Sequence, residues 1–202
     1  MKSLPKIWPE GSSSADWSPC KRYRYTLRRK LGPGTRAIAF IGLNPSTADE
    51  QRDDPTVERC VTRAMRWGYD VFYMLNAFAW RATDPRDMIA ATDPIGEDND
   101  RHILAVLESP SVAEVVLCWG VYGRVLDRSS RLLKLLEPHE SRLRYLALTK
   151  QGEPGHPLYL SYKLELKAWT QRPDNSPPAA NAAARAGRSA ISRRRQKSRS
   201  LA

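Results

Sequence analysis

The sequence lacks the features that mark a metal centre or a membrane protein. Its 202 residues include only three cysteines, Cys20, Cys60 and Cys118, which are widely spaced and form no Cys-x-x-Cys pair. This spacing predicts reduced thiols, with neither a structural metal nor an iron–sulfur cluster. No apolar run approaches the roughly 18 consecutive residues that a membrane span needs, and no signal-peptide pattern opens the chain. We therefore expect a cytoplasmic protein without a metal, a cofactor or a membrane partner.

The sequence also lacks internal repeats, and its length suits one domain with a substantial core. We expect a flexible N-terminal arm over residues 1–20, because this stretch is rich in Ser, Pro and Gly. An α/β domain is expected over residues 21–170. From residue 171 to 202 the chain turns to Pro, Ala, Ser and Arg, which predicts a disordered basic tail.

The positive charge is concentrated in that tail. The net charge is +11, and residues 171–202 hold eight Lys and Arg against Asp174 alone, so seven of the eleven net charges lie there. A basic chain attracts polyanions, of which nucleic-acid backbones are the commonest in a cell. DNA is therefore a candidate partner, although the tail could equally be a solvated extension.

Four apolar segments predict the strands of a mostly parallel sheet. They cover residues 37–41, 71–75, 115–118 and 145–148, and stretches with helical character alternate with them. Asp54-Pro55 and Asp84-Pro85 predict helix starts, Asn99-Asp100 a third, and residues 129–136 a fourth helix. Residues 22–27 alternate as an edge strand does. The pattern indicates a single three-layer α/β domain with about four central strands.

Polar residues and tight turns follow these strands. Gly42-Leu43-Asn44-Pro45-Ser46 follows the first, Asn76 the second, Trp119-Gly120 the third, and the loop containing His156-Pro157-Leu158-Tyr159 the last. In an open α/β sheet, ligands bind at the carboxyl ends of the strands. We therefore expect these strand ends to converge on one crevice.

The order of these motifs resembles the uracil-DNA glycosylase superfamily. The matching strings are Gly42-Leu43-Asn44-Pro45, Leu75-Asn76-Ala77, Leu117-Cys118-Trp119-Gly120 and His156-Pro157-Leu158. Residues 23–163 also look like a family catalogued as domain of unknown function 1643, through Asn44-Pro45-Ser46-Thr47-Ala48, Asp54-Pro55-Thr56, Arg81-Ala82-Thr83-Asp84-Pro85 and His156-Pro157-Leu158-Tyr159. Ser46 and Leu158 depart from the glycosylase pattern, which commonly has Gly and Ser there.

The glycosylase resemblance implies two catalytic residues. His156 would donate a hydrogen bond to a carbonyl of the departing nucleobase, for which a neutral imidazole suffices. Asn44 would orient the attacking water, since an amide can position a water but cannot take its proton. Asp49, Asp53 or Asp54 could supply the carboxylate, with Asp54 also a helix cap.

Further residues are candidates for binding the base or substrate. Asn76 offers a donor and an acceptor to a base edge, although it could also only satisfy loop backbone. Phe78 could stack on a base or belong to the core, and Arg81 could contact phosphate. Tyr159 could wedge into a duplex or pack inward. The remaining candidates come from the first motif: Gly42, Leu43, Pro45 and Ser46.

The sequence thus predicts a nucleobase-binding domain, favoured as a monomer, that excises a damaged or modified base from DNA, a DNA-repair hydrolase. Two alternatives remain open. The first is a non-catalytic nucleic-acid or nucleotide-binding module, suggested by the absence of a general base within the first motif. The second is a hydrolase of free nucleotides or nucleosides.

Overall fold

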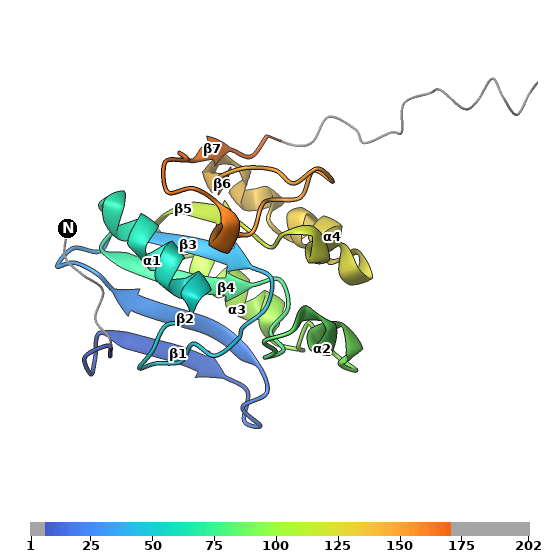
Figure 1. The fold of residues 1–202 in the computed structure, drawn as a ribbon. Helices are drawn as coiled ribbons and strands as arrows, with labels where there is room; N and C mark the ends of the chain where they lie inside the picture. Colours follow the sequence, from blue (N-terminus) through green and yellow to red (C-terminus); the bar gives the residue numbers. More distant parts are fainter. Residues whose placement is uncertain (1–6, 171–202) are drawn as a thin grey trace, which may run out of the picture. The chain divides into compact units, whose positions relative to one another are not determined.

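A computed structural model describes residues 7–170, and its helices and strands form one mixed α/β domain (Figure 1). The predicted tail over residues 171–202 lies outside this range. The strands are β1 (Ser13–Trp17), β2 (Arg24–Lys30), β3 (Ala37–Gly42), β4 (Val71–Asn76), β5 (Val112–Leu117), β6 (Leu143–Tyr145) and β7 (Lys167–Ala168). The α-helices are α1 (Pro55–Arg66), α2 (Pro85–Ala90), α3 (Asn99–Leu107) and α4 (Arg128–Leu135), and 3₁₀ helices cover Val121–Asp127, Glu137–Arg142 and Pro157–Tyr159.

All seven strands form one sheet in the order β1-β2-β4-β3-β5-β6-β7. The central strands β4, β3, β5 and β6 are parallel to one another. The outer strands β1, β2 and β7 pair antiparallel to their neighbours. Three of the four predicted central strands match β3, β4 and β5. The fourth, predicted over residues 145–148, overlaps β6 only at Tyr145, and the total number of strands was too low. The strands that were missed are short or polar edges: β7 has two residues, and β1 alternates between exposed and half-buried positions.

The N-terminal part of the sheet differs from the sequence prediction. Residues 13–17, expected in a flexible arm, form β1, which pairs with β2. Strand β2 is consequently not an edge strand, because β4 covers its other side. Its burial follows: Arg24, Leu27 and Arg29 are all buried. The sequence predicted an edge strand here because arginine alternates with bulky residues, and arginine is seldom fully buried unless it is paired.

Two hydrophobic cores lie on the two faces of the sheet. Ala39 and Ile41 of β3 pack with residues of α3 and α4 on one face. Ile38 and Phe40 pack with α1 on the other. Figure 1 shows α1 in front of the sheet and α3 behind it. Strand β3 is buried throughout, as expected for a central parallel strand covered on both sides.

Two of the three predicted capping side chains, Asp54 and Asp84, cap their helices, and the third, Asn99, does not. Asp54 Oδ1 accepts hydrogen bonds from the backbone N–H of Thr56 and Val57, both at 2.9 Å, and Pro55 opens α1. Asp84 caps α2 in the same way. Asn99, however, is not a capping side chain: it is buried and donates to the carbonyls of Asn76 and Ala77. None of the helices within residues 7–170 combines the length and apolar character needed to cross a bilayer.

Candidate functional site

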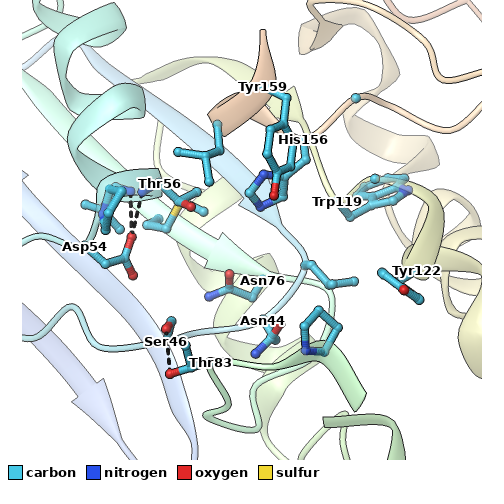
Figure 2. Close-up of a pocket in the computed structure, with 18 of the residues that line it drawn as sticks. Asn44, Ser46, Asp54, Thr56, Asn76, Thr83, Trp119, Tyr122, His156 and Tyr159 are labelled. Atoms are coloured by element: carbon cyan, nitrogen blue, oxygen red, sulfur yellow. Dashed lines mark hydrogen bonds between the residues drawn. The ribbon is translucent and has the colours of Figure 1, made fainter. Parts of the chain in front are cut away.

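A cavity of about 630 Å³ opens at the carboxyl ends of the central strands (Figure 2). The chain leaves β3 toward β4 on one side, and β5 lies on the other side of β3, so the strand order reverses at this point. Ligands of open α/β sheets bind at such a reversal. Its lining comes from the loop after β3, the end of β4, the turn after β5 and the loop that contains His156. The four motifs that the sequence singled out therefore meet at one place.

Asn76 lies at the inner part of this cavity, with its carboxamide among the other polar groups in Figure 2. The residue is 0% exposed, and neither Oδ1 nor Nδ2 has a hydrogen-bond partner among the described residues. An unpaired buried polar group costs about 1–3 kcal/mol, so native structures rarely retain one without a reason. A ligand that presents one acceptor and one donor would satisfy both atoms.

Gly42 supports Asn76 without lining the cavity itself. A Cβ atom at Gly42 would lie 3.2 Å from Asn76 Oδ1 and 2.5 Å from the Met74 methyl group. A side chain here would therefore push against Asn76. The first motif needs glycine at this position for space.

Asn44 is held with its amide nitrogen engaged. Nδ2 donates to the carbonyls of Pro45, at 2.9 Å, and Ala82, at 2.7 Å. Both of its side-chain hydrogen bonds within the described residues are made by Nδ2, which leaves Oδ1 without a donor, and the residue lines the cavity. Asn44 thus presents an acceptor, which is the group that can orient a water molecule by one of its hydrogens.

His156 points into the cavity beside Tyr159 (Figure 2), and the two rings lie 5.7 Å apart between centroids. Its Nδ1 is buried without a partner in the described part of the chain. Loss of solvation lowers the pKa of His156 below its usual 6.5, and the negative charge of Asp54 opposes this shift. The imidazole is therefore neutral at pH 7 and can donate from one ring nitrogen.

Two arginines of α1 fix the loop that follows His156. Arg59 donates to the carbonyls of Pro157 and Leu160, and Arg63 donates to those of Leu160 and Ser161. Arg63 is almost fully buried. Two side chains spaced by four residues on a helix lie on the same face, and here that face carries the loop.

The other side of the loop is held by a buried carboxylate. Glu153 accepts hydrogen bonds from Trp119 Nε1 at 2.8 Å and from Arg124 Nε at 2.8 Å. It thereby connects the turn after β5 to the segment just before His156. The Trp119 indole thus makes a structural hydrogen bond, and the residue also lines the cavity.

The structure separates the three candidate aspartates. Asp53 pairs with the buried Arg29 at 2.7 Å and accepts from Trp8, so it serves the fold. Asp49 accepts two backbone N–H groups of its own turn. Of these three, Asp54 lines the cavity: its Oδ1 caps α1, and Oδ2 accepts no hydrogen bond among residues 7–170.

The predicted binding residues divide into two groups. Leu43, Ser46, Asn76 and Tyr159 line the cavity with Asn44 and His156. Phe78 is fully buried in a hydrophobic core, so the core interpretation holds for it. Pro45 is also buried and contributes its carbonyl to the loop. Arg81 lies in a neighbouring groove instead.

Several lining residues gave no signal in the sequence. Arg24 lines the cavity although it is almost fully buried; its Nη1 donates to the Ala48 carbonyl at 2.8 Å and its Nε has no partner in the described chain. Burial lowers the pKa of Arg24 to about 10, which leaves it protonated at pH 7. Tyr122 also lines the cavity, from a segment that no motif marks. Thr56 and Thr83 line it from two of the motifs, although neither was singled out as a site residue.

The rim of the cavity is apolar. Seven large hydrophobic side chains are exposed among the described residues, and four of them line this cavity: Val121, Tyr122, Leu148 and Tyr159. Tyr159 is the most exposed of them, at 83%. An apolar patch gathered at the mouth of a polar pocket is typical of a surface that a partner covers.

Together these features define a mixed α/β domain with a ligand pocket at the carboxyl ends of its parallel strands. The sequence profile of a family described as protein of unknown function (DUF1643) matches residues 24–158. The chain belongs to this family, as its motifs predicted. No curated protein and no solved structure matches the chain.

Proposed function

We propose that the cavity binds a nucleobase. The observation that carries this proposal is the Asn76 carboxamide, which is fully buried and keeps both a donor and an acceptor unpaired. The edge of a base presents a donor and an acceptor side by side, and a single amide can bond to both. A cavity of about 630 Å³ lies within the range of small-molecule sites and has room for a base with its sugar.

We favour DNA as the source of this base. The motifs that resemble uracil-DNA glycosylases place Asn44, Asn76 and His156 around one cavity. An enzyme that acts on a base in DNA must hold the nucleotide outside the stack. The exposed Tyr159 and the apolar residues beside it at the rim are suited to fill the space that such a nucleotide leaves.

The polar groups of the cavity then support hydrolysis of the N-glycosidic bond. A water oriented by Asn44 Oδ1 would attack the anomeric carbon of the sugar and lose a proton to the Asp54 carboxylate. The bond to the base would break, its electron pair would remain on the base, and His156 would donate a hydrogen bond to the base carbonyl. Neutral His156 is suited to this, because it needs to donate a hydrogen bond and not to be charged.

Base release from labelled oligonucleotides tests the proposal. The panel carries uracil, hypoxanthine, xanthine or modified pyrimidines, and release is followed under single-turnover conditions. The informative variants are Asp54→Asn, which keeps a side chain able to cap α1, and His156→Gln. We expect Asp54→Asn to slow release by about 10²–10⁴-fold, the usual contribution of a positioned base, and His156→Gln by up to about 10²–10³-fold, the contribution of a hydrogen-bond donor aimed at the departing group.

His102→Gln is the matched control, because His102 lies on α3, stacks on Tyr25 and does not line the cavity. It should release base at the wild-type rate. Equal rates in all four proteins would refute the assigned roles. Tight binding without release from any oligonucleotide would instead support a non-catalytic module, and release from free nucleosides alone would support a nucleoside hydrolase.

A further inference from the structure

A second hollow lies beside the cavity and carries a different chemistry. Its volume is about 330 Å³, and Lys21, Arg22 and Arg81 contribute the charged side chains of its lining. No aspartate or glutamate lines it. We call this hollow the basic groove. It continues from the cavity, because Ser46, Thr47, Ala82 and Thr83 line both.

Within residues 7–170 no carboxylate neutralises the cations of the basic groove, although the Cys20 thiol lies beside Arg22 and hydrogen bonds with Ser18 and Arg22 lower its pKa to about 7. Among the described residues none of them forms an ion pair with a carboxylate. Other exposed arginines of the domain do: Arg86 pairs with Asp84 at 2.5 Å, and Arg101 pairs with Asp98 at 2.9 Å. The positive charge of the groove is therefore available to an anionic ligand.

Tryptophan rings orient these cations. The Arg81 guanidinium lies 4.7 Å from the centre of the Trp17 ring, and Lys21 Nζ lies 5.6 Å from the same centre. Arg22 lies 5.6 Å from the centre of the Trp80 ring. The Glu50 carboxylate accepts a hydrogen bond from Trp17 Nε1 at 2.5 Å and so fixes that ring. Stacked arginines lose less freedom on binding than free ones, so the groove is partly organised before a ligand arrives.

The backbone of the turn that carries Lys21 supports the same interpretation. Lys21 has a φ of +60°, in the left-handed region that a residue with a long side chain seldom adopts. The turn is closed by hydrogen bonds from Lys21 N to Ser18 O, at 2.9 Å, and from Ser18 N to Tyr23 O, at 3.0 Å. Such a conformation is retained where surrounding contacts fix it, and here it brings Lys21 to the groove.

We infer that the basic groove binds the phosphate of the DNA strand next to the nucleotide whose base enters the cavity. This inference rests on the proposed function, since it assigns the groove to the backbone of the same strand. The hydroxyl groups of Ser46 and Thr83 lie 3.2 Å apart where the cavity meets the basic groove, and each can donate a hydrogen bond to a phosphate oxygen. Arg81 is thus a phosphate-binding residue and not part of the base pocket.

The salt dependence of binding tests the inference in the full chain. A labelled single-stranded oligonucleotide is titrated by fluorescence anisotropy over a series of salt concentrations, with wild type and the double variant Lys21→Gln/Arg81→Gln. Each lost phosphate contact flattens the plot of log K against log salt by about 0.7 for a single strand, so we expect a change of about 1.4. Contributions of residues 171–202 are equal in both proteins.

The matched control is Arg131→Gln/Lys134→Gln, which removes the same two charges from exposed positions on α4 outside both hollows. A slope change no larger than in this control would overturn the inference. Binding of the free nucleoside is measured in parallel by calorimetry and should be equal in wild type and both variants. If the slope flattens while no nucleoside or base binds, the groove assignment stands as a phosphate site and the proposed function fails.

Discussion

Replacing Asn76 with valine should make the protein more stable while abolishing binding of the base. Both polar atoms of the side chain are buried and unpaired, and each costs about 1–3 kcal/mol in the free protein. Valine removes both costs, is slightly larger than asparagine and suits the end of a strand. We expect the free energy of unfolding to rise by about 2 kcal/mol, which corresponds to about 4–8 °C in Tm for a chain of this length.

Asn99→Val is the control for this experiment. Asn99 is equally buried, but its Nδ2 donates to the carbonyls of Asn76, at 3.0 Å, and Ala77, at 3.2 Å. Valine at position 99 removes this donor, although Arg128 Nε still donates to the Ala77 carbonyl, and it also removes the unpaired Asn99 Oδ1. The two effects oppose each other, so Asn99→Val should not gain stability, whereas Asn76→Val should; urea denaturation and thermal unfolding measure both.

The outcome that would refute the reasoning is loss of stability in Asn76→Val. A decrease of about 1 kcal/mol or more would mean that the amide is satisfied in the free protein, for example by a buried water. The argument that it is kept for a ligand would then be wrong. A rise in stability with unchanged base binding would refute the assignment of Asn76 as the residue that reads the base.

Three further predictions concern the groups around the cavity. Burial lowers the pKa of His156, so as the pH falls the histidine takes up a proton in the unfolded protein before it does so in the folded protein. The free energy of unfolding should therefore decrease from about pH 6.5 downward, and His156→Gln should remove the part of this decrease that His156 causes. His139, whose pKa burial also lowers, contributes equally to both proteins in this comparison. Arg63→Met should cost about 1.5–3 kcal/mol in urea denaturation and weaken base binding, because two carbonyls of the His156 loop lose a charged donor; unchanged binding would show that the loop is held without it. Asp53→Ala should cost about 3–5 kcal/mol, since it leaves the Arg29 guanidinium buried and unpaired, whereas Asp54→Asn should leave stability nearly unchanged; equal losses in the two variants would contradict the separation of their roles.

The centre of the fold could be predicted because its signals are local. An apolar strand that is buried on both faces appears as a continuous run, and Asp-Pro at a helix start combines a cap with a preset φ. The edges could not be predicted in the same way. Strand β1 carries two serines and an aspartate, and it is a strand because the backbone of β2 offers it hydrogen bonds. The hydrogen bonds that make residues 13–17 a strand depend on β2, so the five residues alone carry no pattern that predicts it.

The candidate site was predictable to the extent that it follows strand ends. Asn76 is the last residue of β4, Asn44 lies in the loop after β3 and His156 lies in a motif loop, and the topology brings the three together. The sequence did not predict roles for Arg24 and Arg63, because the burial of an arginine depends on contacts with residues far away in the sequence. The Nη2 of Arg63, for instance, donates to Leu160, which lies 97 positions further along the chain. Arg81 was predicted as a possible phosphate contact, and it lies in the groove beside the cavity and not in the cavity itself.

The distribution of unpaired polar atoms gives the strongest reason to regard the cavity as a binding site. Seven buried side-chain atoms of the described residues have no hydrogen-bond partner, and four of them belong to Arg24, Asn76 and His156, which all line the cavity. The other three belong to Arg63, whose Nη2 holds the His156 loop, and to Asn99, whose Nδ2 donates to the Asn76 carbonyl. The unpaired atoms therefore lie at the cavity and in two residues that support its walls. The protein retains destabilising groups at a place where a ligand can compensate for the four that line the cavity.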